Sequence, residues 1–164
     1  MTASSAPQSS RHVHIAGGGI GGLTLAHALR VAGIGSTVLE RAEVLRPVGT
    51  GITVQMNAML ALRSIGLADA VAREGMPLAS LSTLDPADRL INRLPLEQME
   101  RELGLPAIAI RRSRLQQVLR GELAPTQVRT GCAVTGFRAE ATRQGVRGMP
   151  QEAQLLTSPW GFPL

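Results

Sequence analysis

A glycine-rich turn between an apolar run and an amphipathic segment constrains this chain more than any other feature. Three glycines make a G-x-G-x-x-G pattern: Gly17, Gly19 and Gly22. Residues 13–16 before them read VHIA, which favours a strand buried on both faces. Residues 23–31 after them carry apolar side chains near helical spacing, and Gly33 offers a place for the helix to end. The pattern therefore predicts a strand, a glycine turn and a helix in succession.

A second strand and an acidic residue complete a dinucleotide-binding βαβ unit. Residues 37–39 read TVL, and Glu40 closes this strand at the place where a ribose-binding acid is expected. Gly17 permits the tight turn, Gly19 lets the backbone approach a pyrophosphate, and Gly22 lets the helix pack close to the strand. The phosphates would face the N–H groups and the positive dipole end of the helix. Because its charge repels a 2′-phosphate, Glu40 favours the adenosine of FAD or NAD over that of NADP.

Composition argues against a nucleic-acid or membrane partner. All seventeen basic residues are arginine and are scattered, and two Phe with one Trp give almost no stacking platform. No apolar run is long enough to span a bilayer. Residues 1–10 are small and polar, which is typical of a disordered leader rather than a signal peptide. A cytoplasmic protein is therefore expected.

Side chains that carry chemistry by themselves are scarce. Cys132 is the sole cysteine, so no intrachain disulfide or cysteine-based metal cluster can form. His12, His14 and His27 lack a second ligand at metal-like spacing, so no metal site is expected. No Ser/His/Asp or Cys/His arrangement is present, and no catalytic residue is identified. The chemistry would have to come from a cofactor.

The segment after the βαβ unit predicts a further strand and helix. Residues 52–55 favour a short strand, and Asn57 is expected to be the N-cap of a helix that ends at Gly66. Met56 and Met59 are interpreted as core residues.

Two blocks together resemble the class A flavoprotein aromatic hydroxylases, FAD-dependent monooxygenases related to p-hydroxybenzoate and salicylate hydroxylases. Residues 17–41, GGGIGGLTLAHAL-x-x-x-GI-x-x-x-VLER, match the first FAD motif of that family, including Arg41 after the ribose acid. Residues 49–67, GTGI-x-x-x-x-NAM-x-ALRSIGL, resemble its second block, whose glycine-rich loop lies close to the isoalloxazine edge. Amine oxidases and other flavoproteins have different second blocks.

A third match concerns the segment that would begin the substrate domain. Residues 78–84 and 89–94 read as a hairpin around Asp85-Pro86, which in the family begins the substrate-binding sheet. A short helix over 95–103 and a strand over 107–110 follow.

The next helix carries an R-x-x-L pattern, whose arginine in the family contacts the ribityl and phosphate region of FAD. Arg112 with Leu115 matches it, and Arg111 is the near alternative. A plain surface arginine is the competing interpretation, since a cation at a helix start gains nothing from the dipole.

The resemblance weakens towards the carboxyl end. Residues 127–130 and 133–137 favour strands with Gly131 in the turn between them. Residues 141–164 show no regular periodicity, and the later Asp-Gly and Gly-Asp flavin motifs of the family are absent. We therefore expect a truncated reading frame with an irregular, diverged or out-of-frame tail. Uncovered strand edges would then favour another chain that completes the fold.

The expected fold class is α/β: a Rossmann-like βαβ FAD-binding region over 11–140 that contains the start of a substrate-domain β-sheet. The resemblance implies a monooxygenase that hydroxylates an aromatic or similar small organic substrate with NAD(P)H and O₂. The expected cofactor-binding residues are Gly17, Gly19, Gly22, Glu40, Arg41 and Arg112. Two alternatives remain: a noncatalytic FAD- or nucleotide-binding fragment, and an NAD-binding dehydrogenase domain, in which the GTGI and NAM blocks would have no role.

Overall fold

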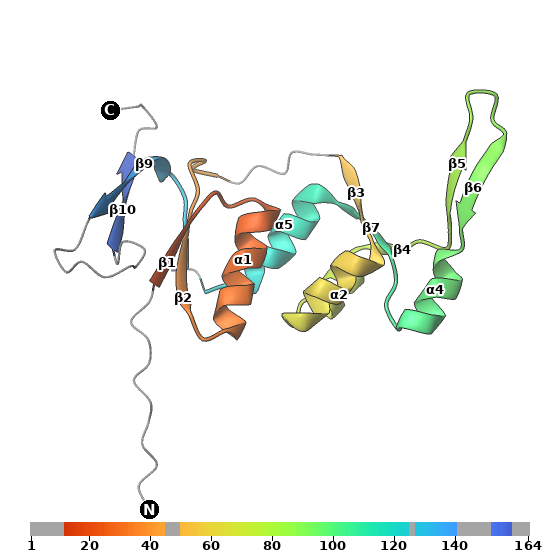
Figure 1. Ribbon diagram of the computed structural model, residues 1–164, viewed down its shortest axis with the longest axis horizontal. Coiled ribbons are helices and arrows are strands. Elements are labelled where there is room, and N and C mark those ends of the chain that lie inside the picture. Colours follow the sequence, from red (N-terminus) through yellow and green to blue (C-terminus); the bar gives the residue numbers. More distant parts are fainter. Residues whose placement is uncertain (1–11, 45–49, 125–126, 141–151, 159–164) are drawn as a thin grey trace, which may run out of the picture. The chain divides into compact units, whose positions relative to one another are not determined.

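The computed structural model describes residues 12–44, 50–124, 127–140 and 152–158 (Figure 1). The chain forms two units: unit 1 combines 1–45 with 123–164, and unit 2 is 46–122. Among the described residues, no helix is both long enough and apolar enough to cross a membrane. The predicted leader, residues 1–10, lies outside the described ranges.

Unit 1 contains the βαβ unit that the glycine pattern predicts. Strand β1 (His12–Ala16), helix α1 (Ile20–Val31) and strand β2 (Gly35–Leu39) follow one another, and β1 pairs with β2 in parallel. Strand β8 (Val128–Arg129) adds to the other edge of β2, also in parallel, so the order is β1-β2-β8. The helix ends as predicted, because Gly33 adopts a left-handed φ of 72° just after it.

The prediction that β1 is buried on both faces is wrong. Only Ile15 is buried in this strand, whereas His12, His14 and Ala16 are exposed. The reason is that α1 contacts β1 and β2, while none of the described segments covers the face that carries the two histidines. In this unit β1 is also an edge strand, with β2 as its sole partner among the described strands.

The predicted irregular tail is wrong for part of its length. Glu152–Ser158 form strand β10, which pairs antiparallel with β9 (Ala133–Glu140). Local periodicity could not indicate β10, because this strand forms through hydrogen bonds to β9, which lies earlier in the sequence. The turn predicted before β9 is confirmed, since Gly131 has a φ of 66°. Residues 141–151 and 159–164 lie outside the described ranges.

Unit 2 begins with a strand and two helices that contribute buried side chains to its core. These are β3 (Gly51–Val54), α2 (Met56–Ser64) and α3 (Ala68–Glu74). The core prediction for Met56 and Met59 is confirmed, because they are 5% and 0% exposed. The N-cap prediction is wrong: Gln55 occupies that position, and Asn57 is an exposed residue inside the first turn. Met56 packs with Leu96 and Ala107, so burial of its side chain begins the helix earlier than the capping preference suggests.

The remaining elements of unit 2 follow the predicted order except for β4, a short strand that the sequence did not indicate. They are β4 (Met76–Pro77), β5 (Leu81–Leu84), β6 (Leu90–Leu94), α4 (Leu96–Leu103), β7 (Ile108–Arg111) and α5 (Arg112–Gly121). Strand β7 is central in an antiparallel sheet of order β3-β7-β4. Helix α5 buries Leu115 and Leu119, which lie one turn apart on the same face.

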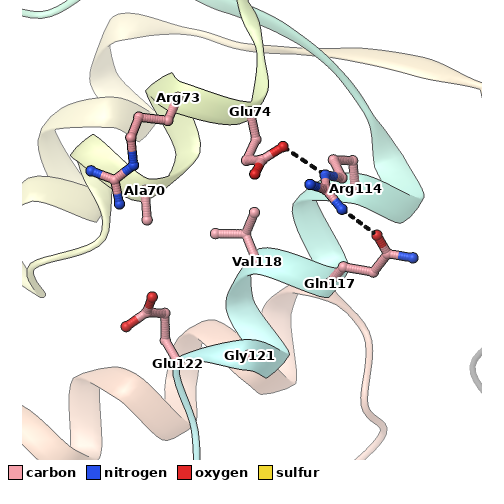
Figure 2. Close-up of a pocket in the computed structure, with 8 residues that line it drawn as sticks. All are labelled: Ala70, Arg73, Glu74, Arg114, Gln117, Val118, Gly121 and Glu122. Carbon is pink, nitrogen blue, oxygen red and sulfur yellow. Dashed lines mark hydrogen bonds and ion pairs between the residues drawn. The ribbon is translucent and has the colours of Figure 1, made fainter.

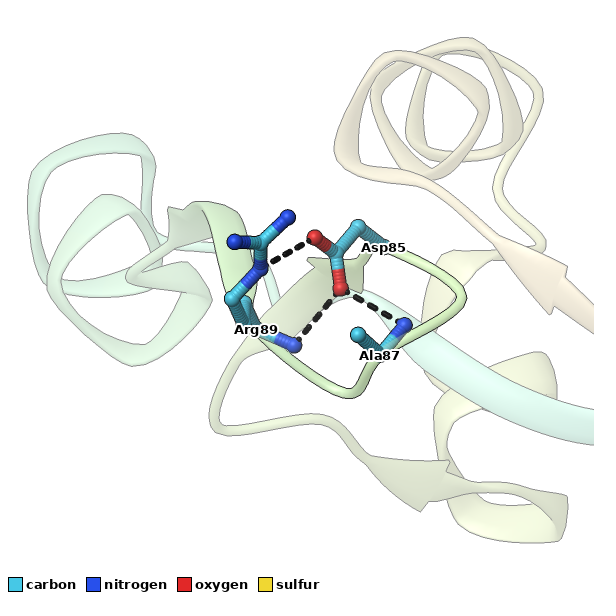
Figure 3. Close-up of polar contacts among 3 residues, drawn as sticks. All are labelled: Asp85, Ala87 and Arg89. Atoms are coloured by element: carbon cyan, nitrogen blue, oxygen red, sulfur yellow. Dashed lines mark hydrogen bonds and ion pairs between the residues drawn. The ribbon is translucent and has the colours of Figure 1, made fainter.

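The β5–β6 hairpin is confirmed, and its turn is closed by one carboxylate (Figure 3). Asp85 Oδ1 accepts the backbone N–H groups of Ala87 and Arg89, both at 2.9 Å, and Oδ2 accepts Arg89 Nε at 2.7 Å. These bonds lower the pKa of Asp85 from its ordinary value of 3.8, the backbone bond from Arg89 contributing most. An Asx-type turn followed by a residue with positive φ, Asp88 at 59°, therefore sets the hairpin.

Candidate functional site

The glycine turn of unit 1 has a geometry that requires glycine at two positions. Gly17 has a φ of 101°, and its N–H donates to the Leu39 carbonyl oxygen at 2.7 Å, which ties the turn to β2. A Cβ atom on Gly22 would collide with the carbonyl oxygen of Gly17 and lie 3.3 Å from Cγ2 of Ile15. Glycine at position 22 therefore lets α1 approach the end of β1.

A third glycine, Gly18, faces the acidic residue that follows β2. Its N–H donates to Oε2 of Glu40 at 2.6 Å, and the N–H of Ala42 donates to Oε1 at 2.9 Å. A Cβ atom on Gly18 would lie 3.1 Å from Cβ of Glu40 and 3.2 Å from its Oε2. The sequence pattern did not single out Gly18, although an uninterrupted run of three glycines before a helix was its available signal.

The amino terminus of α1 remains open to an anion. Gly19 is the N-cap in an extended conformation, no side chain in the described part of the chain caps the helix, and its first turn carries no acidic residue. A Cβ atom on Gly19 would have no other heavy atom within 4 Å, so backbone and space are both accessible there. Helix N–H groups that no side chain satisfies bind anions favourably.

Glu40 can serve a second partner at the same turn. A carboxylate has about four acceptor positions, and the hydrogen bonds from Gly18 and Ala42 occupy one on each oxygen. The side chain is only partly buried, so hydroxyl groups can reach it. The turn thus combines a helix end that can bind an anion with a carboxylate that can accept hydrogen bonds from hydroxyls. An adenosine diphosphate moiety presents both kinds of group, its phosphates and its ribose hydroxyls.

The arginines among the predicted site residues lie at element boundaries. Arg41 directly follows Glu40 and is exposed. Arg112 begins α5 in unit 2, where its N–H donates to the Thr50 carbonyl oxygen at 3.2 Å and its side chain is exposed. Arg111, the near alternative, is the N-cap of α5. Unit 1 therefore places the glycine turn of Gly17, Gly19 and Gly22 next to Glu40, with Arg41 the following residue in the chain. A cofactor-binding role for these residues and Arg112 stays a prediction.

A pocket of about 290 Å³ lies between α3 and α5 of unit 2 (Figure 2). Glu74 accepts a hydrogen bond from Nε of Arg114 at 2.7 Å, and Nη1 of Arg114 also donates to Gln117 at 3.1 Å. The bond to Arg114 lowers the pKa of Glu74 and raises that of Arg114. None of the predicted cofactor residues lines this pocket, whose lining is Ala70, Arg73, Glu74, Arg114, Gln117, Val118, Gly121 and Glu122. The wall of the pocket thus carries charged side chains, of which Glu74 and Arg114 neutralise each other. Its lining contains no glycine-rich turn of the kind that binds a nucleotide.

The chain is similar to several flavin-dependent enzymes. The family model described as "FAD binding domain" matches residues 10–152. The aurachin C monooxygenase/isomerase of Stigmatella aurantiaca is 46% identical over 126 residues, which are 77% of this chain and 33% of that protein. The 3-amino-4-hydroxybenzoate 2-monooxygenase of Streptomyces cremeus is 35% identical over 80% of this chain and 34% of that protein.

Solved structures give the same picture of the fold. HpxO of Klebsiella pneumoniae, complexed with FAD and uric acid, superposes with a TM-score of 0.70 at 24% identity over 82% of this chain and 34% of that chain. The chain spans about a third of the length of the curated relatives it matches.

Proposed function

The chain belongs to the FAD binding domain family, and from this premise we propose that it holds the adenosine half of FAD in a flavin-dependent monooxygenase. FAD is the cofactor that the family description names, which confirms the cofactor implied by the resemblance to the aromatic hydroxylases. The relationship to FAD-dependent monooxygenases expected from the two FAD motifs is likewise confirmed. The proposed substrate is an aromatic or similar small organic molecule, since the relatives include a hydroxybenzoate monooxygenase.

The observation that carries this proposal is the carboxylate of Glu40 held beside an open helix terminus. Two backbone N–H groups fix that carboxylate, at 2.6 and 2.9 Å, before any ligand arrives. The ribose hydroxyls would donate to the remaining acceptor positions of Glu40, and the pyrophosphate would lie at Gly19 and the first turn of α1.

The arginines have supporting roles in this proposal. Arg41 and Arg112 would each offer a planar guanidinium to phosphate oxygens. When bound, the flavin would supply the redox chemistry, in which NAD(P)H provides the electrons and one oxygen atom of O₂ enters the substrate. The part of this chain is to bind and orient the nucleotide end.

The direct test is a titration of the purified chain with FAD, followed by flavin fluorescence and by melting temperature. We expect FAD to bind and to raise the melting temperature by mass action. ADP should compete with FAD because it carries the recognised half, whereas FMN, which lacks adenosine, should not. Failure of FAD to bind, or competition by FMN but not by ADP, would refute the proposed site.

Glu40→Gln is the matched variant for the acid. The loss of one charged acceptor should weaken FAD binding about 10- to 100-fold, which corresponds to about 1.5–3 kcal/mol for a charge-assisted hydrogen bond. Glu97→Gln, in an exposed ion pair of α4, serves as the control and should bind FAD like the parent chain.

The alternative functions give different results in the same experiments. For a dehydrogenase domain, NAD⁺ would raise the melting temperature more than FAD does. A noncatalytic FAD-binding fragment would bind FAD but show no substrate-stimulated oxidation of NAD(P)H, and a remnant without function would stay colourless with no FAD affinity.

A further inference from the structure

The chain segment after strand β8 lies at the same edge of the unit 1 sheet as the glycine turn. Strands β1, β2 and β8 are parallel, so their carboxyl ends share one edge. The glycine turn follows β1, Glu40 follows β2, and residues 130–132, which we call the β8–β9 turn, follow β8. Three stretches that are distant in the sequence therefore end at the edge where the carboxylate of Glu40 lies.

The β8–β9 turn and the end of β8 bond to the backbone of Glu40 and of its neighbour Ala42. The N–H of Glu40 donates to the carbonyl oxygen of Arg129 at 2.9 Å, and the N–H of Cys132 donates to the carbonyl oxygen of Glu40 at 2.8 Å. The N–H of Gly131 donates to the carbonyl oxygen of Ala42 at 3.1 Å. Both backbone polar groups of Glu40 are thus bonded to this one stretch of chain.

Ala42 links these backbone bonds to the carboxylate. Its carbonyl oxygen accepts from Gly131, while its own N–H donates to Oε1 of Glu40 at 2.9 Å. Movement of residues 40–42 away from the β8–β9 turn would therefore shift the donor that fixes Oε1. The N–H of Gly18 would still hold Oε2, so the carboxylate would lose one of the two bonds that orient it.

The shape of the β8–β9 turn depends on a glycine in the left-handed conformation. Gly131 has a φ of 66°. This conformation is disfavoured about 5- to 30-fold for alanine, because its Cβ comes close to the following carbonyl oxygen. A Cβ atom on Gly131 would lie 3.7 Å from Cγ of Glu43, which is an ordinary contact. Alanine at position 131 therefore meets a conformational penalty and no clash.

We propose that Gly131 is a positioning residue for ribose recognition: its conformation lets the β8–β9 turn hold residues 40–42, and these hold the carboxylate of Glu40. The inference rests on the proposed function, in which this carboxylate accepts the ribose hydroxyls of FAD. A turn that relaxes lowers the fraction of molecules with the carboxylate in place. The apparent affinity for the ligand falls in proportion to that fraction.

The test compares Gly131→Ala with Gly131→Asn and with Gly104→Ala in the full chain. Asparagine adopts the left-handed conformation more readily than alanine, so Gly131→Asn is the conservative rescue. Gly104, the C-cap of α4 in unit 2, has the same φ of 66° and open space at its Cβ position, so Gly104→Ala carries a matched penalty in the other unit.

Each variant has a distinct expected effect on the binding of FAD and ADP. Gly131→Ala should weaken both about 3- to 10-fold, and Gly131→Asn should stay within about twofold of the parent chain. Gly104→Ala should lower the melting temperature and leave both affinities unchanged. Circular dichroism establishes that each variant is folded.

The ribose hydroxyls provide a readout that a general loss of stability would not move. The ratio of the affinities for ADP and for its 2′,3′-dideoxy form measures what the hydroxyls contribute to binding. This ratio should fall about 3- to 10-fold in Gly131→Ala. In a double-mutant cycle with Glu40→Gln, the combined loss of FAD affinity should be smaller than the product of the single losses, because both changes act through one carboxylate.

Hydrogen exchange of the parent chain gives a measurement that needs no variant. Coupling between two sites is reciprocal, so FAD should slow exchange at the amides of Gly131 and Cys132. Unchanged exchange at both amides would contradict the coupling.

The outcomes separate this inference from the function on which it rests. Absence of FAD and ADP binding to the parent chain refutes both. Binding to the parent chain, with Gly131→Ala and Gly104→Ala equal in affinity, refutes the positioning role alone. An unchanged ratio between ADP and its dideoxy form in Gly131→Ala does the same.

Discussion

Replacement of Gly22 by alanine should destabilise the chain, although alanine is the better helix former. The added Cβ would overlap the carbonyl oxygen of Gly17 and lie 3.2 Å from its carbonyl carbon. Those atoms cannot yield easily, because the N–H of Gly17 is bonded to Leu39 and its φ is fixed at 101°. The helix must therefore move away from β1. Overpacking of this kind lowers the free energy of unfolding by about 1–3 kcal/mol.

The neighbouring residue provides a control in the same helical turn. A Cβ atom on Gly21 would have no other heavy atom within 4 Å, so Gly21→Ala meets open space. It should stabilise the chain by up to about 1 kcal/mol, because glycine loses more backbone entropy than alanine in a helix. The same gain partly offsets the clash at Gly22, so the difference between the two variants isolates the steric cost.

Thermal unfolding by far-UV circular dichroism measures this difference. At about 2–4 °C per kcal/mol for a chain of this size, the two variants should melt about 2–12 °C apart, with Gly21→Ala the higher. Gly22→Ala should also lose FAD affinity, because the displaced helix carries the proposed phosphate-binding terminus. If Gly22→Ala melts at or above Gly21→Ala, the argument that this glycine sets the helix–strand distance is refuted.

Three further outcomes follow from unit 2. Folding lowers the pKa of Asp85, so its stabilising contribution is present above pH 3.8 and is lost as the pH falls through the lower folded-state pKa. The NMR chemical shifts of the hairpin amides, followed against pH, should show this transition, and Asp85→Asn should abolish it. Arg114→Gln should move the Glu74 titration upwards towards 4.5, measured by carboxyl NMR, and an unchanged midpoint would contradict the assigned cause. Leu119→Ala should cost about 2–5 kcal/mol in chemical denaturation because this side chain is 0% exposed; a loss below 1 kcal/mol would contradict its place in the core.

Elements with strong local signals could be predicted from the sequence. The βαβ unit was recovered because glycines with positive φ, such as Gly17 and Gly33, mark its turns and the apolar spacing marks its helix. The β5–β6 hairpin was recovered because the Asp85-Pro86 pair has a local mechanism, a carboxylate that accepts nearby N–H groups.

The errors arose where distant residues decide the outcome. Strand β10 exists through pairing with β9, and α2 begins early because Met56 packs with Leu96 and Ala107. The exposure of β1 depends on which segments cover each sheet face, which the apolar character of residues 13–16 does not encode. Each case is a non-local contact that overrides a local preference.

The contact between Gly18 and Glu40 belongs to the same non-local class, and it changes how the motif is understood. The motif identifies Glu40 as an acceptor for ribose but leaves open what orients it. The structure shows that the turn itself does so, since the N–H of Gly18 holds one carboxylate oxygen while that of Ala42 holds the other. A side chain that is already fixed loses less rotamer entropy when a ligand binds. In the proposed site, the residue between the first two motif glycines would therefore contribute to ribose recognition through the acid, and a side chain at position 18 would press on Glu40.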